Sequence, residues 1–264
     1  MIDTLRQRFH DLHATDTFVM PNPFDVGSAK LLEHLGFPAL ATTSSGHAAT
    51  LGRNDQHVTR DELLRHVEAI TSAVTVPVNV DSEYCFADDL HGIADTVRLL
   101  AAAGASGCSI EDYNPATRAI DPMEVSSDRV ATAAAAANEH GMLLTARTEG
   151  LLYGRDDVDG VIDRLVAFWE AGADCVYAPG LRSVADIRRA VEAVDVAVNV
   201  LAMPDVPPVP ELAALGVRRI SVGGALAWAA YRGLERAARQ LITDGTFGYL
   251  DDILAADLRN SIFT

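Results

Sequence analysis

The sequence predicts an α/β fold, a (β/α)8 TIM barrel formed by residues 1–264 as one domain. Short apolar strand stretches alternate with amphipathic helical stretches of ten to twenty residues, and the alternation runs through eight units. Such alternation is typical of a parallel sheet with helical crossovers. Eight units in about 250 residues is the size of a TIM barrel. No linker-like segment interrupts them, and a hydrophobic content of 49% supplies a substantial core.

The strand stretches are short and rich in β-branched residues, as in Val76-Pro77-Val78-Asn79-Val80. Strands are predicted at 17–20, 39–43, 76–80, 107–110, 143–146, 175–177, 197–201 and 219–222. Helices are predicted at 26–35, 60–73, 89–103, 123–140, 158–171, 183–194, 209–215 and 225–243. Four of these helices are followed by a glycine between two apolar residues, at Gly36, Gly104, Gly172 and Gly216. Glycine there supplies the left-handed residue that turns the chain toward the next strand. The segment from about 244 onward is predicted to be a helical C-terminal extension.

An open doubly wound sheet is the competing fold. It usually carries a glycine-rich phosphate fingerprint after its first strand, whereas the sequence here reads Met20-Pro21-Asn22-Pro23-Phe24-Asp25. The barrel is therefore the favoured prediction.

Composition limits the classes of function. The formal net charge of −16 argues against binding to nucleic acid, which requires a basic surface. The three cysteines, Cys85, Cys108 and Cys175, are odd in number and lack metal-ligand spacing, which favours a reducing compartment. No stretch has the length of a signal peptide core or of a membrane span. We therefore expect a cytoplasmic protein that contacts neither membranes nor nucleic acid.

Two carboxylates end the third predicted strand. Asp81 and Glu83 are two residues apart, so they project from the same face where the strand ends. Oxygen ligands of this kind suit Mg²⁺ or Mn²⁺. Taken alone, the pair is better explained as a solvated acidic turn.

Further polar residues follow the other predicted strands. They are Ser44, Ser45, Gly46 and His47 after the second strand, Glu111 after the fourth, Arg147 after the fifth, Asn199 in the seventh and Gly223-Gly224 after the eighth. In a barrel these strand ends share one rim. A divalent cation would offset the repulsion among the clustered acids and leave Arg147 free to bind a substrate carboxylate in bidentate fashion. Ser44, Ser45 and the Gly46 amide add hydrogen-bond donors for an anionic oxygen. Each residue also has an ordinary structural explanation, such as a helix cap for the serines or a core amide for Asn199.

The ordered combination of these motifs resembles the isocitrate lyase/phosphoenolpyruvate mutase superfamily. The motifs are Asn22-Pro23-Phe24-Asp25, Thr43-Ser44-Ser45-Gly46, Asp55, Asp81-Ser82-Glu83, Ile110-Glu111-Asp112, Ala146-Arg147-Thr148 and the stretch 216–223. The resemblance implies a modified TIM barrel whose last helix is exchanged between subunits, in a homotetramer or dimer of dimers. It implies Asp81 as the principal metal ligand, with Glu83 and Glu111 acting through metal-bound water. It also implies that Asp55 lies on a mobile loop near the site, and that Ser45, Gly46 and Arg147 bind substrate oxygens.

The chain departs from the superfamily at the parts that define each reaction. The lyases carry a Lys-x-Cys-Gly-His loop after the fourth strand, where this chain reads Glu111-Asp112-Tyr113-Asn114-Pro115. The mutase has a tryptophan at the position of Ser44. The segment Tyr177-Ala178-Pro179-Gly180 has neither the acid of the lyases nor the histidine of the mutase. His47 and Tyr84 are candidates for the missing general acid or base, although a loop histidine and a packing tyrosine are equally good explanations.

We therefore expect a Mg²⁺-dependent lyase that cleaves a C–C bond in a small 2-oxo or 2-hydroxy (di)carboxylate, or decarboxylates it, through a metal-stabilised enolate. Its predicted partners are this small molecule and further copies of the chain. One alternative is a C–P mutase or hydrolase acting on a phosphonopyruvate-like substrate. Another is a barrel that binds oxo acids without turning them over. A third is a phosphosugar barrel that uses Gly223-Gly224.

Overall fold

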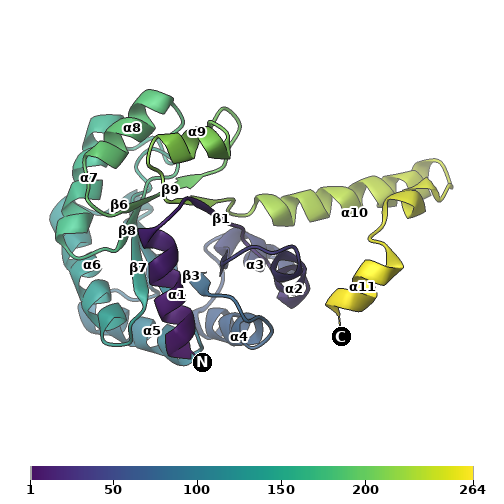
Figure 1. Ribbon diagram of the computed structural model, residues 1–264, viewed down its shortest axis with the longest axis horizontal. Coiled ribbons are helices and arrows are strands. Elements are labelled where there is room, and N and C mark those ends of the chain that lie inside the picture. Colours follow the sequence, from purple (N-terminus) through teal and green to yellow (C-terminus); the bar gives the residue numbers. More distant parts are fainter. Residues whose placement is uncertain (1, 264) are drawn as a thin grey trace.

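The computed structural model describes residues 2–263 and shows eight parallel strands in a nearly closed barrel surrounded by helices (Figure 1). The strands are β1 (Phe18–Met20), β2 (Leu40–Ala41), β3 (Val78–Asp81), β4 (Gly107–Glu111), β7 (Leu143–Arg147), β8 (Cys175–Tyr177), β9 (Ala197–Leu201) and β10 (Arg219–Ser221). Their order in the sheet is β1-β10-β9-β8-β7-β4-β3-β2. This order confirms the predicted barrel, because each strand lies beside its neighbour in sequence and β10 returns to β1. A short hairpin of β5 (Tyr113–Asn114) and β6 (Ala119–Ile120) follows β4.

The first and last strands of this order, β1 and β2, meet at a seam with no strand ladder. One backbone hydrogen bond crosses the seam, from the Ala41 N–H to the Pro21 carbonyl at 3.0 Å. The side chain of Asn22 adds a second link, because its Nδ2 donates to the Thr42 carbonyl at 2.9 Å.

The helices lie where the hydrophobic pattern predicts them, with ends that differ by a few residues. They are α2 (Val26–His34), α4 (Arg60–Thr71), α5 (Leu90–Ala102), α6 (Met123–Asn138), α7 (Val158–Glu170), α8 (Val184–Glu192), α9 (Val209–Ala214) and α10 (Ala225–Thr243). The glycine turns are also confirmed, since Gly36, Gly104, Gly172 and Gly216 have φ values of 89°, 90°, 101° and 92°. A residue with a side chain would be strained at these left-handed positions.

Two helices were not predicted from the sequence, α1 (Ile2–Ala14) and α3 (Ser44–Thr50). Helix α1 contributes to the floor of the barrel with Phe9, which is fully buried beside Leu143 and Cys175. Burying a phenylalanine side chain is worth about 1.5–3 kcal/mol. Arg6 of α1 fixes the helix to the end of α5 by donating to the carbonyls of Ala105 and Ala101 at 3.1 and 2.8 Å.

The C-terminal segment leaves the barrel as an arm (Figure 1). Helix α10 projects outward, and η1 (Gly248–Asp252) and α11 (Ala256–Ile262) follow it, with α11 returning to contact α2. Ala227 is the one buried residue of α10. Large apolar side chains are exposed along the arm, namely Trp228, Leu234, Leu241, Ile242, Phe247, Leu250, Ile253, Leu254 and Phe263. Of the helices within residues 2–263, none is both long enough and apolar enough to span a membrane.

Candidate active site

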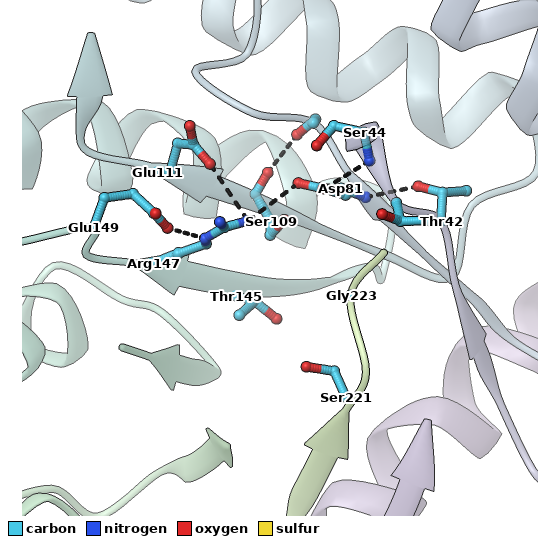
Figure 2. A network of polar contacts seen from close by, with 12 residues as sticks. Thr42, Ser44, Asp81, Ser109, Glu111, Thr145, Arg147, Glu149, Ser221 and Gly223 are labelled. Carbon is cyan, nitrogen blue, oxygen red and sulfur yellow. Dashed lines mark hydrogen bonds and ion pairs between the residues drawn. The ribbon is translucent and has the colours of Figure 1, made fainter. Parts of the chain in front are cut away.

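Asp81 ends β3 at the carboxyl rim of the barrel, and the beginning of α3 holds it in place. The Ser44 N–H donates to Asp81 Oδ2 at 3.0 Å, and the Asp81 N–H donates to Thr42 Oγ1 at 2.9 Å (Figure 2). Thr43 caps α3, because its side chain accepts a hydrogen bond from the Gly46 N–H at 3.3 Å. The carboxylate of Asp81 therefore lies at the positive end of a short helix.

Arg147 ends β7 and lies among three carboxylates (Figure 2). Its Nη1 is 3.6 Å from Asp81 Oδ1 and 3.5 Å from Glu111 Oε2, while its Nε donates to Glu149. The pairing of β4 with β7 sets Glu111 opposite Arg147. Burial alone would lower the pKa of Arg147, but the charges of Glu149 and Glu111 raise it well above the usual value. The guanidinium is thus permanently charged, and the three carboxyl groups around it outnumber its single positive charge.

Glu83 and Glu111 are buried acids whose charged forms are disfavoured. Burial, with the nearby charges of Asp81 and Asp55, raises the pKa of Glu83 to about 8. Burial also raises the pKa of Glu111 well above its usual value, although the charge of Arg147 opposes the shift. Glu83 has a φ of 48°, a left-handed backbone that costs a residue with a side chain roughly 1–2 kcal/mol.

The segment between α3 and α4 brings two more residues to this rim. Asp55 is an exposed residue, but partial desolvation of its carboxyl, followed by the charge of Asp81, raises its pKa. Gln56 donates from Nε2 to Glu111 Oε1 at 3.1 Å. Sequence reasoning missed Gln56, because a glutamine in a polar loop gives no signal of its own.

The residues at this rim fit a Mg²⁺ ion. Asp81 Oδ1 is buried and accepts no hydrogen bond, and Glu83 and Glu111 lie beside it with raised pKa values. Oxygen donors with uncompensated negative charge are what this ion requires. Within residues 2–263, no three acidic, histidine or cysteine side chains converge as a ready set of ligands. In general Mg²⁺ binds proteins through one or two carboxylates and keeps several waters.

His47, predicted as a general acid or base, does not join the rim carboxylates. Its ring stacks on His66 of α4 at 3.7 Å between centroids and 15° between planes. The chain forms α3 from Ser44 onward, where the sequence indicates only polar residues after the second strand, and α3 directs His47 toward His66 of α4. Burial lowers the pKa of His47 and lowers that of His66 to about 3. Both rings are therefore neutral packing groups.

Tyr84 also points away from Asp81. Its hydroxyl donates to Asp121 and accepts a hydrogen bond from Asn114 Nδ2 at 3.1 Å. The strand does not continue beyond Asp81, because residues 83, 85 and 86 have left-handed backbones, so strand periodicity fails there. Burial, followed by the hydrogen bond to Asp121, raises the pKa of Tyr84 to about 12.

Asn199 lies below the rim in the barrel interior. Its Nδ2 donates to Ser221 Oγ at 2.9 Å, and its Oδ1 accepts from Arg219 Nε at 2.9 Å. A small cavity of about 50 Å³ extends from Asp81 and Arg147 down to this layer. Asn199 therefore lines the floor of the site with its amide already engaged.

The Arg219 side chain in this interior layer makes further hydrogen bonds. Its Nη2 donates to Thr145 Oγ1 at 2.9 Å, and its Nη1 lies 3.2 Å from His13 Nε2. His13 donates from Nδ1 to the Phe9 carbonyl at 2.8 Å, so its Nε2 is the acceptor for Arg219. This network joins the floor helix α1 to the strands that carry the rim.

The Gly223-Gly224 turn has few free backbone N–H groups with which to bind a phosphate. The amides of Val222 and Gly223 donate to Asn22 Oδ1 at 3.0 and 2.9 Å and are thereby occupied. At Gly224 a side chain would approach Ser45 Oγ to 3.2 Å, so the glycine serves the close packing of α3 against this turn. The turn therefore packs directly against Ser45.

Comparison with known proteins identifies the family of this chain. Residues 9–242 match the phosphoenolpyruvate phosphomutase family. A solved structure from Burkholderia cenocepacia J2315, provisionally assigned as a lyase/mutase, is 41% identical, covers 100% of this chain and 98% of its own, and superposes with a TM-score of 0.95. An oxaloacetate decarboxylase of Paraburkholderia xenovorans strain LB400 is 32% identical over 86% of this chain and 76% of its own length. Phosphonopyruvate hydrolase, solved in complex with oxalate and Mg²⁺, shares the fold at 22% identity and a TM-score of 0.87, with 98% and 94% of the two chains covered. The chain therefore belongs to the phosphoenolpyruvate phosphomutase family, within the isocitrate lyase/phosphoenolpyruvate mutase superfamily.

Proposed function

We propose that this protein is a Mg²⁺-dependent lyase that cleaves a C–C bond in, or decarboxylates, a small 2-oxo or 2-hydroxy (di)carboxylate. The observation that carries the proposal is the buried Asp81 Oδ1, which accepts no hydrogen bond and has only an ion-pair contact with Arg147, with Glu83 and Glu111 close by. The relative named oxaloacetate decarboxylase acts on such an acid, and the complex of phosphonopyruvate hydrolase contains Mg²⁺ with the related anion oxalate.

The residues of the rim have separate roles in binding the ion and the substrate. Asp81 would hold the ion directly, and Glu83 and Glu111 would hold its waters. When bound, Mg²⁺ supplies Lewis-acid stabilisation of negative charge on the α-oxygen of the substrate. With the acids engaged in this way, Arg147 grips the substrate carboxylate with its planar guanidinium. Ser45, at the beginning of α3, binds a remaining substrate oxygen, whereas the Gly46 N–H already donates to Thr43 Oγ1.

The hairpin of β5 and β6 bears on the type of reaction. It occupies the place of the lyase loop that carries a cysteine, and residues 113–120 contain neither cysteine nor histidine. Neither His47 nor Tyr84 contacts a rim carboxylate. Cleavage leaves an electron pair on the substrate carbon, and the proton that neutralises it comes from water. Decarboxylation of an oxo acid fits this site best, because it needs no general base to begin.

A substrate screen tests the proposal. We expect Mg²⁺-dependent turnover of oxaloacetate or an alkylmalate, abolished by EDTA and by Asp81→Ala. Asp195→Ala, an exposed acid before β9 at the opposite end of the barrel, is the control and should behave as wild type. Turnover of phosphonopyruvate alone would reassign the protein to C–P chemistry. Metal-dependent oxalate binding without any turnover would make it a binding protein, and no metal-dependent binding at all would refute the site.

We also propose that the protein is a homo-oligomer built through the C-terminal arm. A monomer would leave the apolar side chains of α10 and the segment after it in water, including Trp228 at 54% and Ile242 at 86% exposure. A second copy of this chain would cover them, and the superfamily's exchange of its last helix between subunits supports this arrangement.

A further inference from the structure

The loop that carries Glu83 has a strained backbone. Glu83, Cys85 and Phe86 have φ values of 48°, 59° and 52°, so three of four consecutive residues occupy the left-handed region without a glycine. Residues with side chains stay in this region only where the surroundings hold them there, and such places concentrate at functional sites. What holds this loop therefore also sets the direction of the Glu83 carboxyl.

Arg129 of α6 is the side chain that clamps this loop. Its Nη2 donates to the carbonyls of Tyr84 and Ala87 at 2.7 and 3.0 Å. The guanidinium lies 3.4 Å above the centre of the Tyr84 ring. The side chain is 4% exposed, and none of the ion pairs within residues 2–263 includes it. The buried Arg129 cation thus donates its hydrogen bonds to the backbone of a strained loop. Hydrogen bonds from a charged donor are stronger than those between neutral groups.

The clamp extends to the fourth strand and to the hairpin. The Glu111 N–H donates to the Glu83 carbonyl at 3.0 Å, so the backbones of these two acids are joined directly. The Tyr84 hydroxyl donates to Asp121, and Asn114 Nδ2 donates to Asp121 Oδ1 at 3.2 Å. The ring that Arg129 covers therefore ties the Glu83 loop to the base of the β5–β6 hairpin.

We propose that Arg129 is a positioning residue, which holds the loop of residues 83–86 left-handed and so aims Glu83 at the metal held by Asp81. The proposal rests on the proposed Mg²⁺ site and adds a residue that touches neither the ion nor the substrate. Side chains that orient metal-binding groups in this way typically account for about 10–100-fold in metal affinity.

The test compares Arg129→Lys with Arg6→Lys. Arg6 is a matched control, since it is also buried and donates to two backbone carbonyls, but at the floor of the barrel. Mn²⁺ binding to each variant is measured by calorimetry, and hydrogen exchange is measured at the amides of Cys85 and Glu111, which close the loop. For Arg129→Lys we expect about 10–100-fold weaker Mn²⁺ binding and faster exchange at both amides. For Arg6→Lys we expect wild-type values of both.

A rescue experiment separates positioning from general destabilisation. Phe86→Gly removes the cost of one left-handed residue, so in the Arg129→Lys background it should restore part of the lost Mn²⁺ affinity. If Arg129→Lys fails to fold, Tyr84→Phe provides the second variant, because it keeps the ring under Arg129 and removes only the hydroxyl's hydrogen bonds with Asp121 and Asn114. It should weaken Mn²⁺ binding severalfold.

The outcomes distinguish this inference from the proposed function. Wild-type Mn²⁺ affinity and wild-type exchange in Arg129→Lys would overturn the role of Arg129 while leaving the metal site intact. Absence of Mn²⁺ binding in the wild-type protein would refute the metal site. Exchange at Cys85 and Glu111 would then still decide whether Arg129 holds the loop, since that measurement needs no metal.

Discussion

Arg147 is surrounded by more negative charge than it can neutralise. It contacts Asp81, Glu111 and Glu149. Glu83 also lies close enough for the charge of Arg147 to lower its pKa, against the larger effect of burial. In water such pairs contribute little, but in this mostly buried site each unpaired acid is costly. Burial raises the pKa values of Glu83 and Glu111, so protonation of these two acids would lower that cost.

This predicts that metal binding releases protons. The folded-state pKa of Glu83, about 8, lies above the unfolded value of roughly 4.3. Its contribution to stability is therefore fully present below about pH 4.3 and is lost as the pH rises through 8. Since a metal ion needs the carboxylate, binding at pH 7 should release roughly one proton from Glu83. Calorimetry in buffers of different ionisation enthalpy measures this release, and Glu83→Gln should reduce it. An unchanged release in that variant would assign the proton to another group.

At the residue scale, the sequence predicted the composition of the site better than the direction of its side chains. Asp81, Glu111 and Arg147 could be placed together because they end parallel strands, whose carboxyl ends meet at one rim. His47 and Tyr84 follow the strands in helical or left-handed segments, where strand periodicity no longer applies. Gln56 reaches Glu111 from a loop, and no periodicity predicts where such a residue will point.

Helix α3 is the element that joins the substrate-binding donors to Asp81, and it packs too tightly for a side chain at Gly46. A Cβ there would lie 2.6 Å from Thr43 Cγ2 and 3.0 Å from Phe24 Cβ. The helix could accommodate it only by shifting away from the rim, which would loosen the Ser44 hydrogen bond to Asp81.

Gly46→Ala should therefore destabilise the protein by about 1–3 kcal/mol and weaken substrate binding as well. Thermal or urea unfolding and a substrate titration measure the two effects. Gly27→Ala in α2 is the control, because its Cβ would make ordinary contacts at 3.6 Å or more, and it should be neutral or slightly stabilising. Equal effects of the two substitutions would argue against tight packing of α3.

At the element scale, the sequence predicted every strand of the barrel but not α3. Thr43-Ser44-Ser45-Gly46 consists of residues that cap helices or favour turns, so its local propensity indicates a loop. The packing of Gly46 against Phe24 and Ala227 supplies the stability that this propensity lacks. Such contacts between distant segments cannot be read from a local pattern.

At the scale of the whole molecule, the arm is the part that the barrel does not explain. The amphipathic pattern of residues 225–243 predicts a helix with one apolar face, but the pattern does not say which surface covers that face. The sequence therefore predicted the helix correctly, while its path away from the barrel could be expected only from the resemblance to the superfamily.

If the arm forms the interface between copies, Ile242→Glu combined with Leu234→Glu should reduce the assembly to a smaller species, because charges would replace two exposed apolar side chains. Size-exclusion chromatography with light scattering measures the mass. Val125→Glu on α6, an apolar position on the barrel wall that is 45% exposed, is the control and should leave the mass unchanged. A wild-type protein that is monomeric at micromolar concentration would refute the assembly.

The seam between β1 and β2 has a consequence for how the barrel moves. Elsewhere each strand is joined to its neighbour by a ladder, whereas one backbone hydrogen bond, from Ala41 to the Pro21 carbonyl, closes this junction. Local opening begins where the fewest bonds must break. The seam between β1 and β2 is therefore the weakest junction of the barrel. The hydrogen bond from Asn22 to Thr42, directly beyond it, links the seam to the segment that leads into α3. Opening of the seam and loosening of the substrate-binding end of α3 would be one motion.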